Sequence, residues 1–339
     1  MKIVVTGGSG FIGSELVRYY ISKKIKVVNI DNLSQGSVNE ANLIFNKNKY
    51  YKFFKINILN KIKIYEILSN EKPDAIFHLA AESHVDNSIN TPLKTFNTNV
   101  MGTLNIIEVV RELINKKKLS NKFKFLHIST DEVYGSLKPN NKNSTENSIY
   151  KPSSPYSASK ASSDHIIQSW IKTYSLPGII THCANNYGPW QFPEKLIPVV
   201  IYNCINKSLI PIYGSGKNIR EWIFVKDHIR ALDTIFTKGK IGEVYNIGSG
   251  YRISNINLVI KICNIMNNIY KQNIDYKKLI KFVRDRPGHD YKYSINSNKL
   301  RKNLNFKNSY KFDESLYITI DWYLNNKKWL YKKKNSIEK

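Results

Sequence analysis

The sequence of 339 residues predicts an α/β fold with a doubly wound parallel sheet, followed by a smaller C-terminal part of mixed α/β structure. Two observations predict it. Short apolar runs alternate with amphipathic segments over the first half of the chain, a pattern typical of parallel sheets covered by helices on both faces. A glycine-rich turn joins the first apolar run to the first amphipathic segment, which is typical of the Rossmann-type fold.

The first three elements form a strand, a helix and a strand. Lys2–Thr6 is a β-branched run, and a glycine loop follows it at once. Phe11–Ser22 has apolar residues at helical spacing, and Lys26–Ile30 is another short apolar run that ends at Asp31. This order predicts a βαβ unit.

The alternation continues along the chain. We expect strands at Ala75–Ala80, Phe123–Ser129 and Gly178–Cys183, with helices at Thr95–Leu113 and Ser157–Thr173. After residue 188, prolines interrupt the pattern, so we divide the chain into a Rossmann domain at 1–188, a second domain at 189–325 and a basic tail at 326–339. Two later segments, Val225–Phe236 and Val244–Ile247, are predicted to return to the first sheet.

Composition excludes several classes of protein. An apolar content of 42% supports a sizeable core. The formal net charge of +26 raises nucleic acid as a partner, but the lysines are spread along the chain and interleaved with asparagine, as in Asn46–Lys49. We therefore expect no nucleic-acid partner, and we interpret Lys332–Lys334 as part of a solvated tail.

The cysteines and the apolar runs bear on the compartment. Cys183, Cys204 and Cys263 have neither metal-ligand spacing nor a disulfide pattern, so we expect free thiols, no metal and a reducing compartment. No apolar run reaches the length of a membrane span, and Lys2–Thr6 leads directly into the glycine loop rather than a signal peptide. The sequence predicts a cytoplasmic protein without a membrane partner.

The glycine loop predicts a dinucleotide site. Gly7, Gly10 and Gly13 allow a sharp turn, close approach to a pyrophosphate and tight packing of helix on strand. The helix that follows directs its N-terminus at the phosphates. Asp31, at the end of the next strand, can accept both ribose hydroxyls and would repel a 2′-phosphate. The pattern favours NAD over NADP.

Two further clusters predict acid–base chemistry. Tyr156 and Lys160 lie one helical turn apart on one face, where a lysine ammonium would favour the phenolate and let the tyrosine act as a base. Asp131 and Glu132 follow the strand Phe123–Ser129, at the edge of the sheet where ligands bind in open α/β folds. Two acids in different environments can divide into one acid and one base.

The chain resembles the extended short-chain dehydrogenase/reductase family, and within it the dTDP-glucose 4,6-dehydratases, from the first strand to about Asn305. The resemblance is carried by TGGSGFIG at 6–13, HLAAESHVD at 78–86, STDEVYG at 129–135, YSASK at 156–160, NNYGPWQFPEKLIP at 185–198 and RDRPGHD at 284–290. The adjacent acids in STDEVYG are the specific part, because the resemblance implies that 4-epimerases lack them there. It further implies a lyase of deoxysugar biosynthesis, as in the dTDP-rhamnose pathway.

The resemblance implies the catalytic roles. Tyr156 would take the proton of the sugar 4-hydroxyl, Thr130 would hydrogen-bond the 4-oxygen, and Lys160 would lower the pKa of Tyr156 and hold the nicotinamide ribose. Glu132 would remove the C5 proton, and Asp131 would protonate the departing 6-hydroxyl. NAD would be regenerated in each turnover and could stay bound.

The resemblance also implies the binding residues and a homodimer built through the helices near Thr95–Leu113 and Ser157–Thr173. The cofactor would contact Gly7, Gly10, Phe11, Ile12, Gly13, Asp31, Asn32, Asn57, Ile58, Ala80, Ala81, Thr98, Tyr156, Lys160 and Asn186. A nucleotide-sugar, held mainly by the second domain, would contact Ser83, His84, Thr130, Asn185, Lys195, Leu196, Ile197, Pro198, Pro211, Tyr213, Arg220, Asn255, Arg286 and His289. Arg220 and Arg286 suit a diphosphate.

The sequence departs from the family pattern in places, and alternatives stay open. Asn57 stands where an aspartate is usual near the adenine, Asn87 and Tyr291 stand where arginine is common, and Asn32–Ser37 is closer to the epimerases and decarboxylases. A UDP- or CDP-glucose dehydratase, or another nucleotide-sugar epimerase or dehydratase, is the first alternative. A non-catalytic module that senses NAD or binds nucleic acid through the basic surface is the second.

Overall fold

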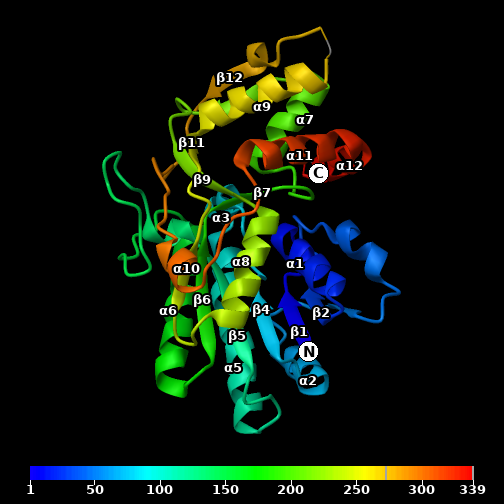
Figure 1. Ribbon diagram of the computed structural model, residues 1–339, viewed down its shortest axis with the longest axis vertical. Helices are drawn as coiled ribbons and strands as arrows, with labels where there is room; N and C mark the ends of the chain where they lie inside the picture. Colours follow the sequence, from blue (N-terminus) through cyan, green and yellow to red (C-terminus); the bar gives the residue numbers. More distant parts are fainter. Residues whose placement is uncertain (272, 338–339) are drawn as a thin grey trace.

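A seven-stranded parallel sheet forms the centre of the computed structural model, which describes residues 1–271 and 273–337 (Figure 1). Every neighbouring pair of strands in this sheet runs parallel. The strands, in their order across the sheet, are β10 (Val244–Ile247), β6 (Gly178–Cys183), β5 (Lys124–Thr130), β4 (Ala75–His78), β1 (Lys2–Thr6), β2 (Lys26–Asp31) and β3 (Tyr51–Lys55). The strand order reverses at β1, and ligands bind beside such switch points in open α/β sheets.

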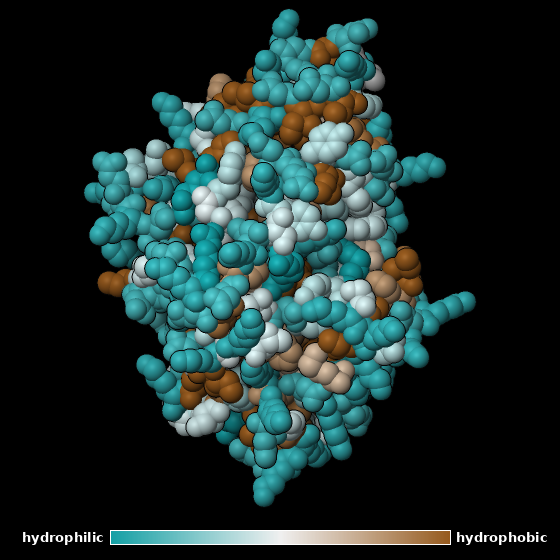
Figure 2. Space-filling view, in the orientation of Figure 1, coloured by the Kyte–Doolittle hydropathy of each residue, from teal (hydrophilic) through white to brown (hydrophobic). Residues whose placement is uncertain are grey.

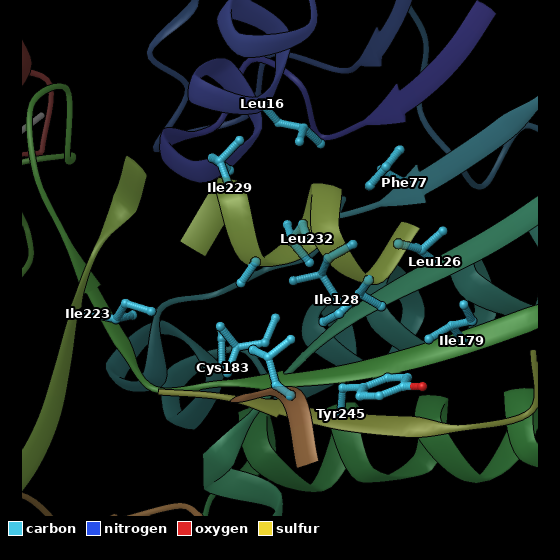
Figure 3. Close-up of a cluster of buried hydrophobic side chains, with 14 of the residues drawn as sticks. Leu16, Phe77, Leu126, Ile128, Ile179, Cys183, Ile223, Ile229, Leu232 and Tyr245 are labelled. Atoms are coloured by element: carbon cyan, nitrogen blue, oxygen red, sulfur yellow. The ribbon is translucent and has the colours of Figure 1, made fainter. Parts of the chain in front are cut away.

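Helices cover both faces of the sheet. One face packs against α1 (Phe11–Ser22) and α8 (Val225–Lys238), where Leu16, Phe77 and Leu232 are fully buried together (Figure 3). The other face packs against α2 (Lys61–Glu71), α5 (Gly102–Asn115) and α6 (Pro155–Tyr174). The doubly wound fold predicted from the alternating pattern is therefore confirmed.

The second part of the chain builds two small sheets and the helices around them (Figure 1). Its strands are β7 (Asn185–Tyr187), β8 (Ile210–Tyr213), β9 (Ile219–Phe224), β11 (Arg252–Ser254) and β12 (Ile280–Val283). Its helices are α7 (Leu196–Asn206), α9 (Asn255–Ile269), α11 (Phe312–Asn325) and α12 (Lys327–Asn335), whereas α10 (Asn298–Asn303) packs against β10 of the large sheet. Short helical turns elsewhere are α3 (Val85–Asn90), η1 (Asn39–Phe45), η3 (Asp131–Tyr134) and η4 (Tyr276–Leu279). The smaller mixed α/β part has its own core, built around Tyr187, Leu258 and Leu316.

The two segments predicted to return to the first sheet do so. α8 packs on α1, and β10 pairs with β6 at the edge of the sheet. Because α8 and β10 lie beyond residue 188, the first layer structure is not contiguous in sequence. The domain boundary at residue 188 stays a prediction.

The helix expected over Thr95–Leu113 is longer and contains an insertion. α4 (Pro92–Phe96) continues through a π-helical turn at Asn97–Met101 into α5. Such insertions widen one turn and often occur at functional sites. Thr98, a predicted cofactor residue, lies inside this widened turn.

The tail expected to be solvated after residue 325 is instead helical. Residues Lys327–Asn335 form α12, in which Leu330 is fully buried and Lys333 forms an ion pair with Glu40. This helix was not recognised in the sequence because lysines flank its two apolar positions, Trp329 and Leu330. Both residues pack against the core of the second part of the chain.

The surface, the helices and the cysteines agree with a chain that exposes hydrophilic residues and carries free thiols inside. Hydrophilic residues cover most of the face in Figure 2, with hydrophobic ones in small groups. Within residues 1–271 and 273–337, no helix is long and apolar enough to cross a membrane. Cys183, Cys204 and Cys263 are all buried free thiols.

Candidate active site

A cavity of about 320 Å³ opens at the carboxyl ends of β1, β4, β5 and β6. This volume is in the range of small-molecule sites. Every residue predicted to contact the cofactor lines the cavity, and so do all the predicted catalytic residues. The fold thus brings together groups that lie as far apart in the sequence as Gly7 and Asn186.

The glycine loop forms one wall of this cavity. Gly7 has a φ of +73°, and a Cβ added there would lie 2.7 Å from the backbone nitrogen of Ala80. The Gly10 N–H donates to the Gly7 carbonyl at 3.1 Å, which closes the turn before α1. No side chain caps the start of α1, so its first backbone N–H groups are free to bind a pyrophosphate.

Asp31 lies at the edge of the same wall of the cavity. Its carboxylate accepts from the Ser9 N–H at 3.0 Å and from the Leu33 N–H at 2.8 Å. Burial raises the pKa of Asp31 despite these two hydrogen bonds. The carboxylate lies where a ribose would follow the pyrophosphate, and its charge disfavours a 2′-phosphate.

Gly13 fixes how closely α1 approaches the loop. A Cβ there would lie 2.1 Å from the Gly7 carbonyl oxygen, and these are backbone atoms that cannot turn aside. We expect Gly13→Ala to lower the free energy of unfolding by about 1–3 kcal/mol, as overpacking does. Thermal unfolding measures this. Gly10→Ala is the matched control, since its Cβ would lie 3.3 Å from the same oxygen; an equal loss in both variants would contradict the prediction.

The opposite end of the cofactor wall is more apolar. Ile58 is buried there, and Ala80 and Ala81 follow β4. Asn57 is exposed, and its side-chain oxygen accepts from the Leu59 N–H at 2.9 Å. The amide that replaces the usual aspartate therefore stabilises its own loop.

Thr130, Asp131 and Glu132 stand where β5 ends. The Glu132 N–H donates to the Thr130 hydroxyl at 3.3 Å, which begins η3 and turns both acids toward the cavity. The Thr130 hydroxyl in turn donates to Asp131 Oδ1 at 3.4 Å. Asp131 Oδ2 is buried without a hydrogen-bond partner among the described residues, so it is available to a ligand.

The start of α6 positions the tyrosine and lysine. Ser154 and Ser157 form a capping box, and Pro155 is the first helical residue. Tyr156 and Lys160 then lie one turn apart and both line the cavity. The Lys160 ammonium donates to the Ile128 carbonyl at 2.8 Å, which anchors α6 to β5.

The charge balance at Tyr156 differs from the sequence prediction. Burial raises the pKa of Tyr156 well above its usual value, and the charges of Glu132, Cys183 and Asp131 raise it further. A hydrogen bond from Thr130 opposes this rise. Burial lowers the pKa of Lys160. The low pKa of the phenol that was predicted from Lys160 is not reproduced by these residues alone, because burial and the nearby acids raise it.

The two acids have different electrostatic surroundings. Burial, the neighbouring Glu132 and Glu221 raise the pKa of Asp131 well above its usual value. Burial also raises the pKa of Glu132, but Arg220, Arg286 and Lys195 oppose that rise. The protonated form is therefore favoured more strongly at Asp131, and the ionised form at Glu132.

A buried carboxylate supports the site from behind. Asp164, one turn beyond Lys160 on α6, accepts from the Ser129 hydroxyl at 2.9 Å and contacts the His182 and His127 rings at 3.0 and 3.2 Å. These contacts hold its pKa below the usual range in spite of burial. Its charge also raises the pKa of Lys160 and so favours the ammonium form.

Some predicted substrate residues line the cavity and others lie outside it. Ser83, His84, Asn185 and Lys195 are in the lining, and the Lys195 ammonium donates to the Ser83 carbonyl at 2.9 Å. Arg220 is buried just outside, and it donates to the Asp290 carbonyl at 3.0 Å. Its charge lowers the pKa of Glu132, so it lies close to the acid pair.

The remaining predicted substrate residues do not line the cavity. Ile197 and Pro198 are buried in α7, and Leu196 packs against the same core, so these three have packing contacts. Arg286 forms an ion pair with Asp86 at 3.5 Å. The others are Pro211 and Tyr213, exposed on β8; Asn255, at the start of α9; and His289, whose ring bonds Asp285 at 2.6 Å.

Several cavity residues were missed by sequence reasoning. Cys183 ends β6 in the lining, and burial raises the pKa of its thiol to about 12. Gln191 donates to the Asn186 carbonyl at 2.9 Å, and Phe192 lies beside it. The position of Cys183 at the end of an apolar strand was a usable signal. Glu82 and Gln191 lie inside the motifs at 78–86 and 185–198, and residues 34–37 lie inside the Asn32–Ser37 stretch, but nothing in the sequence assigned these positions to the cavity.

Comparison with known proteins agrees with this geometry. The chain matches the family model described as GDP-mannose 4,6 dehydratase over residues 4–319. The dTDP-glucose 4,6-dehydratase 1 of Escherichia coli (strain K12) is 46% identical, over 97% of this chain and 94% of that protein.

Two solved structures extend the comparison. The dTDP-glucose 4,6-dehydratase of Bacillus anthracis, in complex with NAD, has a TM-score of 0.87 and 37% identity, covering 98% of this chain and 99% of that one. The dTDP-glucose 4,6-dehydratase of Streptomyces venezuelae, also with NAD bound, has a TM-score of 0.89 and 34% identity, covering 97% and 98%.

A dinucleotide loop that faces a Tyr–Lys pair across one cavity in a doubly wound sheet defines the extended short-chain dehydrogenases/reductases. The relatives are more specific than this class. The chain belongs to the dTDP-glucose 4,6-dehydratase family, whose members are NAD-dependent hydro-lyases.

Proposed function

We propose that this enzyme converts dTDP-glucose to dTDP-4-keto-6-deoxyglucose and water, with NAD as a cofactor that is restored in each turnover. The observation that carries the proposal is the convergence of Tyr156, Asp131 and Glu132 on one cavity beside the glycine loop. A plain alcohol dehydrogenase needs the tyrosine but has no use for the acid pair. Elimination of water across C5 and C6 requires a base and an acid.

The residues around the cavity suit NAD. The uncapped N-terminus of α1 would bind the pyrophosphate, and Asp31 would bind the ribose. When bound, NAD would supply the oxidising power at C4 of the sugar and the reducing power at C6. Lys160 would orient the nicotinamide ribose, because its ammonium is fixed between Ile128 and the cavity.

The chain's own side chains would then move the protons. Tyr156 accepts the proton of the 4-hydroxyl, and Thr130 hydrogen-bonds the same oxygen. The 4-keto group acidifies C5, and Glu132 removes that proton. Asp131 gives its proton to the 6-hydroxyl, so the C6–O bond breaks and water leaves. The acid–base division follows the surroundings of the two carboxyls, because Asp131 favours the protonated form more strongly.

A nucleotide-sugar would extend from the acid pair toward the second part of the chain. Arg220, whose charge acts on Glu132, and Arg286 are suited to the diphosphate. Lys195, Ser83 and Asn185 line the connecting wall. We assign Tyr213, Asn255 and His289 to the nucleotide end, and Leu196–Pro198 to the packing that supports Lys195.

Product analysis tests the proposal and separates it from the UDP-glucose, CDP-glucose and epimerase alternatives. The purified protein is incubated with dTDP-, UDP- and CDP-glucose in turn, without added NAD, and the products are weighed by mass spectrometry. We expect dTDP-glucose to lose water fastest. An unchanged mass with a new C4 configuration indicates an epimerase. Loss of water only from UDP- or CDP-glucose indicates a dehydratase that prefers a nucleotide other than dTDP.

We also propose that the enzyme is a cytoplasmic homodimer. Buried free thiols fit a reducing compartment. Leu93, Phe96 and Met101 are exposed apolar residues on the helical segment that leads into α5, one of the two helices expected in the dimer. Light scattering over a range of concentrations tests the assembly, and the mass of a monomer throughout would exclude a stable dimer.

A further inference from the structure

We propose that α12 is a clamp on the adenosine side of the cofactor cavity, with Lys333 as the positioning residue that fastens the 34–42 segment in place. The inference rests on the proposed use of NAD as a resident cofactor. It concerns the part of the chain that sequence analysis expected to be a solvated tail.

The polar part of the clamp is centred on Lys333. Its ammonium donates to the Ser37 carbonyl at 2.7 Å and forms an ion pair with Glu40 at 2.9 Å. Lys332 approaches the other oxygen of Glu40 at 3.6 Å. The side chain of Lys333 is only 14% exposed, against 73% for Lys332. The ion pair of Lys333 with Glu40 is therefore better shielded from solvent than the contact of Lys332 with Glu40, so its electrostatic attraction is screened less.

An apolar cluster joins the same two segments. Val38, Ala41 and Phe192 are buried together, and Trp329 of α12 and Ile337 just after it pack against them. The Trp329 ring also meets the Trp190 ring edge-on, with centroids 5.3 Å apart. These aromatic and aliphatic contacts hold α12 against the 34–42 segment, behind the residues that line the cavity.

The clamped segment is itself part of the cofactor site. Residues 34–37 and Phe192 line the cavity. On its other side, the segment is bonded to the glycine loop: the Val38 N–H donates to the Ser9 carbonyl at 2.7 Å, and the Asn42 amide donates to the Gly8 carbonyl at 2.8 Å. The Ser9 N–H in turn donates to Asp31.

These contacts form one continuous connection from α12 through Ser37 and Glu40 to the loop and carboxylate that would hold the adenosine half of NAD. NAD that is restored in each turnover does not have to dissociate between turnovers. Contacts that keep the 34–42 segment closed over the cavity therefore favour retention of NAD. The clamp stabilises the closed wall, and opening it requires the Lys333 contacts to break.

The test compares NAD dissociation from full-length variants. Lys333→Met removes the charge and keeps the apolar stem, whereas Lys328→Met removes an equal charge from an exposed position of the same helix. We expect NAD to dissociate about three- to tenfold faster from Lys333→Met, since a shielded ion pair contributes roughly 1 kcal/mol, or about fivefold in an equilibrium constant. Dissociation from Lys328→Met should equal that of the wild type.

Two further measurements keep the outcome decisive. Hydrogen exchange without NAD should be faster at residues 34–42 in Lys333→Met, while exchange in β4 and β5 stays unchanged. Glu40→Gln approaches the same contact from the other side and should reproduce the faster dissociation if Lys333→Met folds poorly. Equal dissociation rates in wild type, Lys333→Met and Glu40→Gln would overturn the clamp. A wild type that holds NAD but releases no dehydrated product would overturn the proposed function and leave the clamp standing.

Discussion

Replacing Tyr156 by phenylalanine is expected to reduce formation of the dehydrated product about 10²- to 10⁴-fold, the usual contribution of a positioned general base. The phenol oxygen lies in the cavity with Thr130, Asp131 and Glu132 around it, and phenylalanine keeps the ring and the packing. The 4-hydroxyl would lose its proton acceptor, so oxidation at C4, the first step, should be the step that fails. Mass spectrometry should detect neither a 4-keto-glucose nucleotide nor the dehydrated product.

Tyr150→Phe is the matched control for this prediction. Tyr150 is also a tyrosine in a polar cluster, and its hydroxyl lies 3.1 Å from His182 Nε2, but it lies outside the lining of the cavity. Its loss should leave the turnover rate within a few-fold of the wild type. If the two variants had similar rates, Tyr156 could not be the base.

The pKa of Tyr156 also bears on how the activity of the enzyme depends on pH. Burial and the charge of Glu132 raise the pKa of Tyr156, so the phenol is protonated near neutral pH in the residues as they stand. Activity that needs the phenolate should rise as pH increases toward the pKa of the phenol. A positive charge bound beside the phenol would lower the pKa of Tyr156 and move this rise in activity to lower pH. The low pKa that the sequence analysis predicted therefore requires a further positive charge besides Lys160.

The parts of the fold that sequence analysis predicted are those that local signals mark. β1 and α1 have the predicted bounds because β-branched residues, glycines and helical apolar spacing coincide over Lys2–Ser22. β3 was missed because Tyr51–Lys55 lies at the edge of the sheet, where two exposed lysines interrupt aromatic residues that are only partly buried. α12 was missed because its five lysines outnumber Trp329 and Leu330, the apolar residues that pack it against the second core. A lysine-rich chain hides amphipathic elements, since long side chains can lie over apolar surface with only the ammonium exposed.

The candidate site shows a similar division. Short motifs predicted which residues would share the cavity, because TGGSGFIG, HLAAESHVD and STDEVYG lie at the carboxyl ends of neighbouring strands, and YSASK begins α6, which is anchored to β5. They could not predict the electrostatic contrast between Asp131 and Glu132. That contrast depends on Glu221, which raises the pKa of Asp131, and on Arg286, which opposes the rise at Glu132, and both residues come from the second part of the chain. Charges that arrive from distant segments are a property of the tertiary fold.

Replacing Glu132 by glutamine is expected to stop elimination while oxidation at C4 partly survives. Glutamine keeps the size of the side chain and cannot accept the C5 proton, so the dehydrated product should fall about 10²- to 10⁴-fold. A 4-keto-glucose nucleotide that has not lost water should accumulate and be detectable by mass. Glu82→Gln is the control, because Glu82 also lines the cavity but pairs with Lys94 at 3.1 Å.

Solvent deuterium distinguishes the roles of the two acids. In heavy water, Asp131→Asn should still exchange the C5 hydrogen, because Glu132 remains to remove it, whereas the C6–O bond should break far more slowly without a proton donor. Glu132→Gln should lose that exchange. The contrast follows from the surroundings: Arg220, Arg286 and Lys195 favour the ionised form of Glu132, whereas Glu132 and Glu221 disfavour it at Asp131. If Asp131→Asn lost the exchange and Glu132→Gln kept it, the acid and the base would have to be interchanged, and the field of these distant charges would not be what divides the two carboxyls.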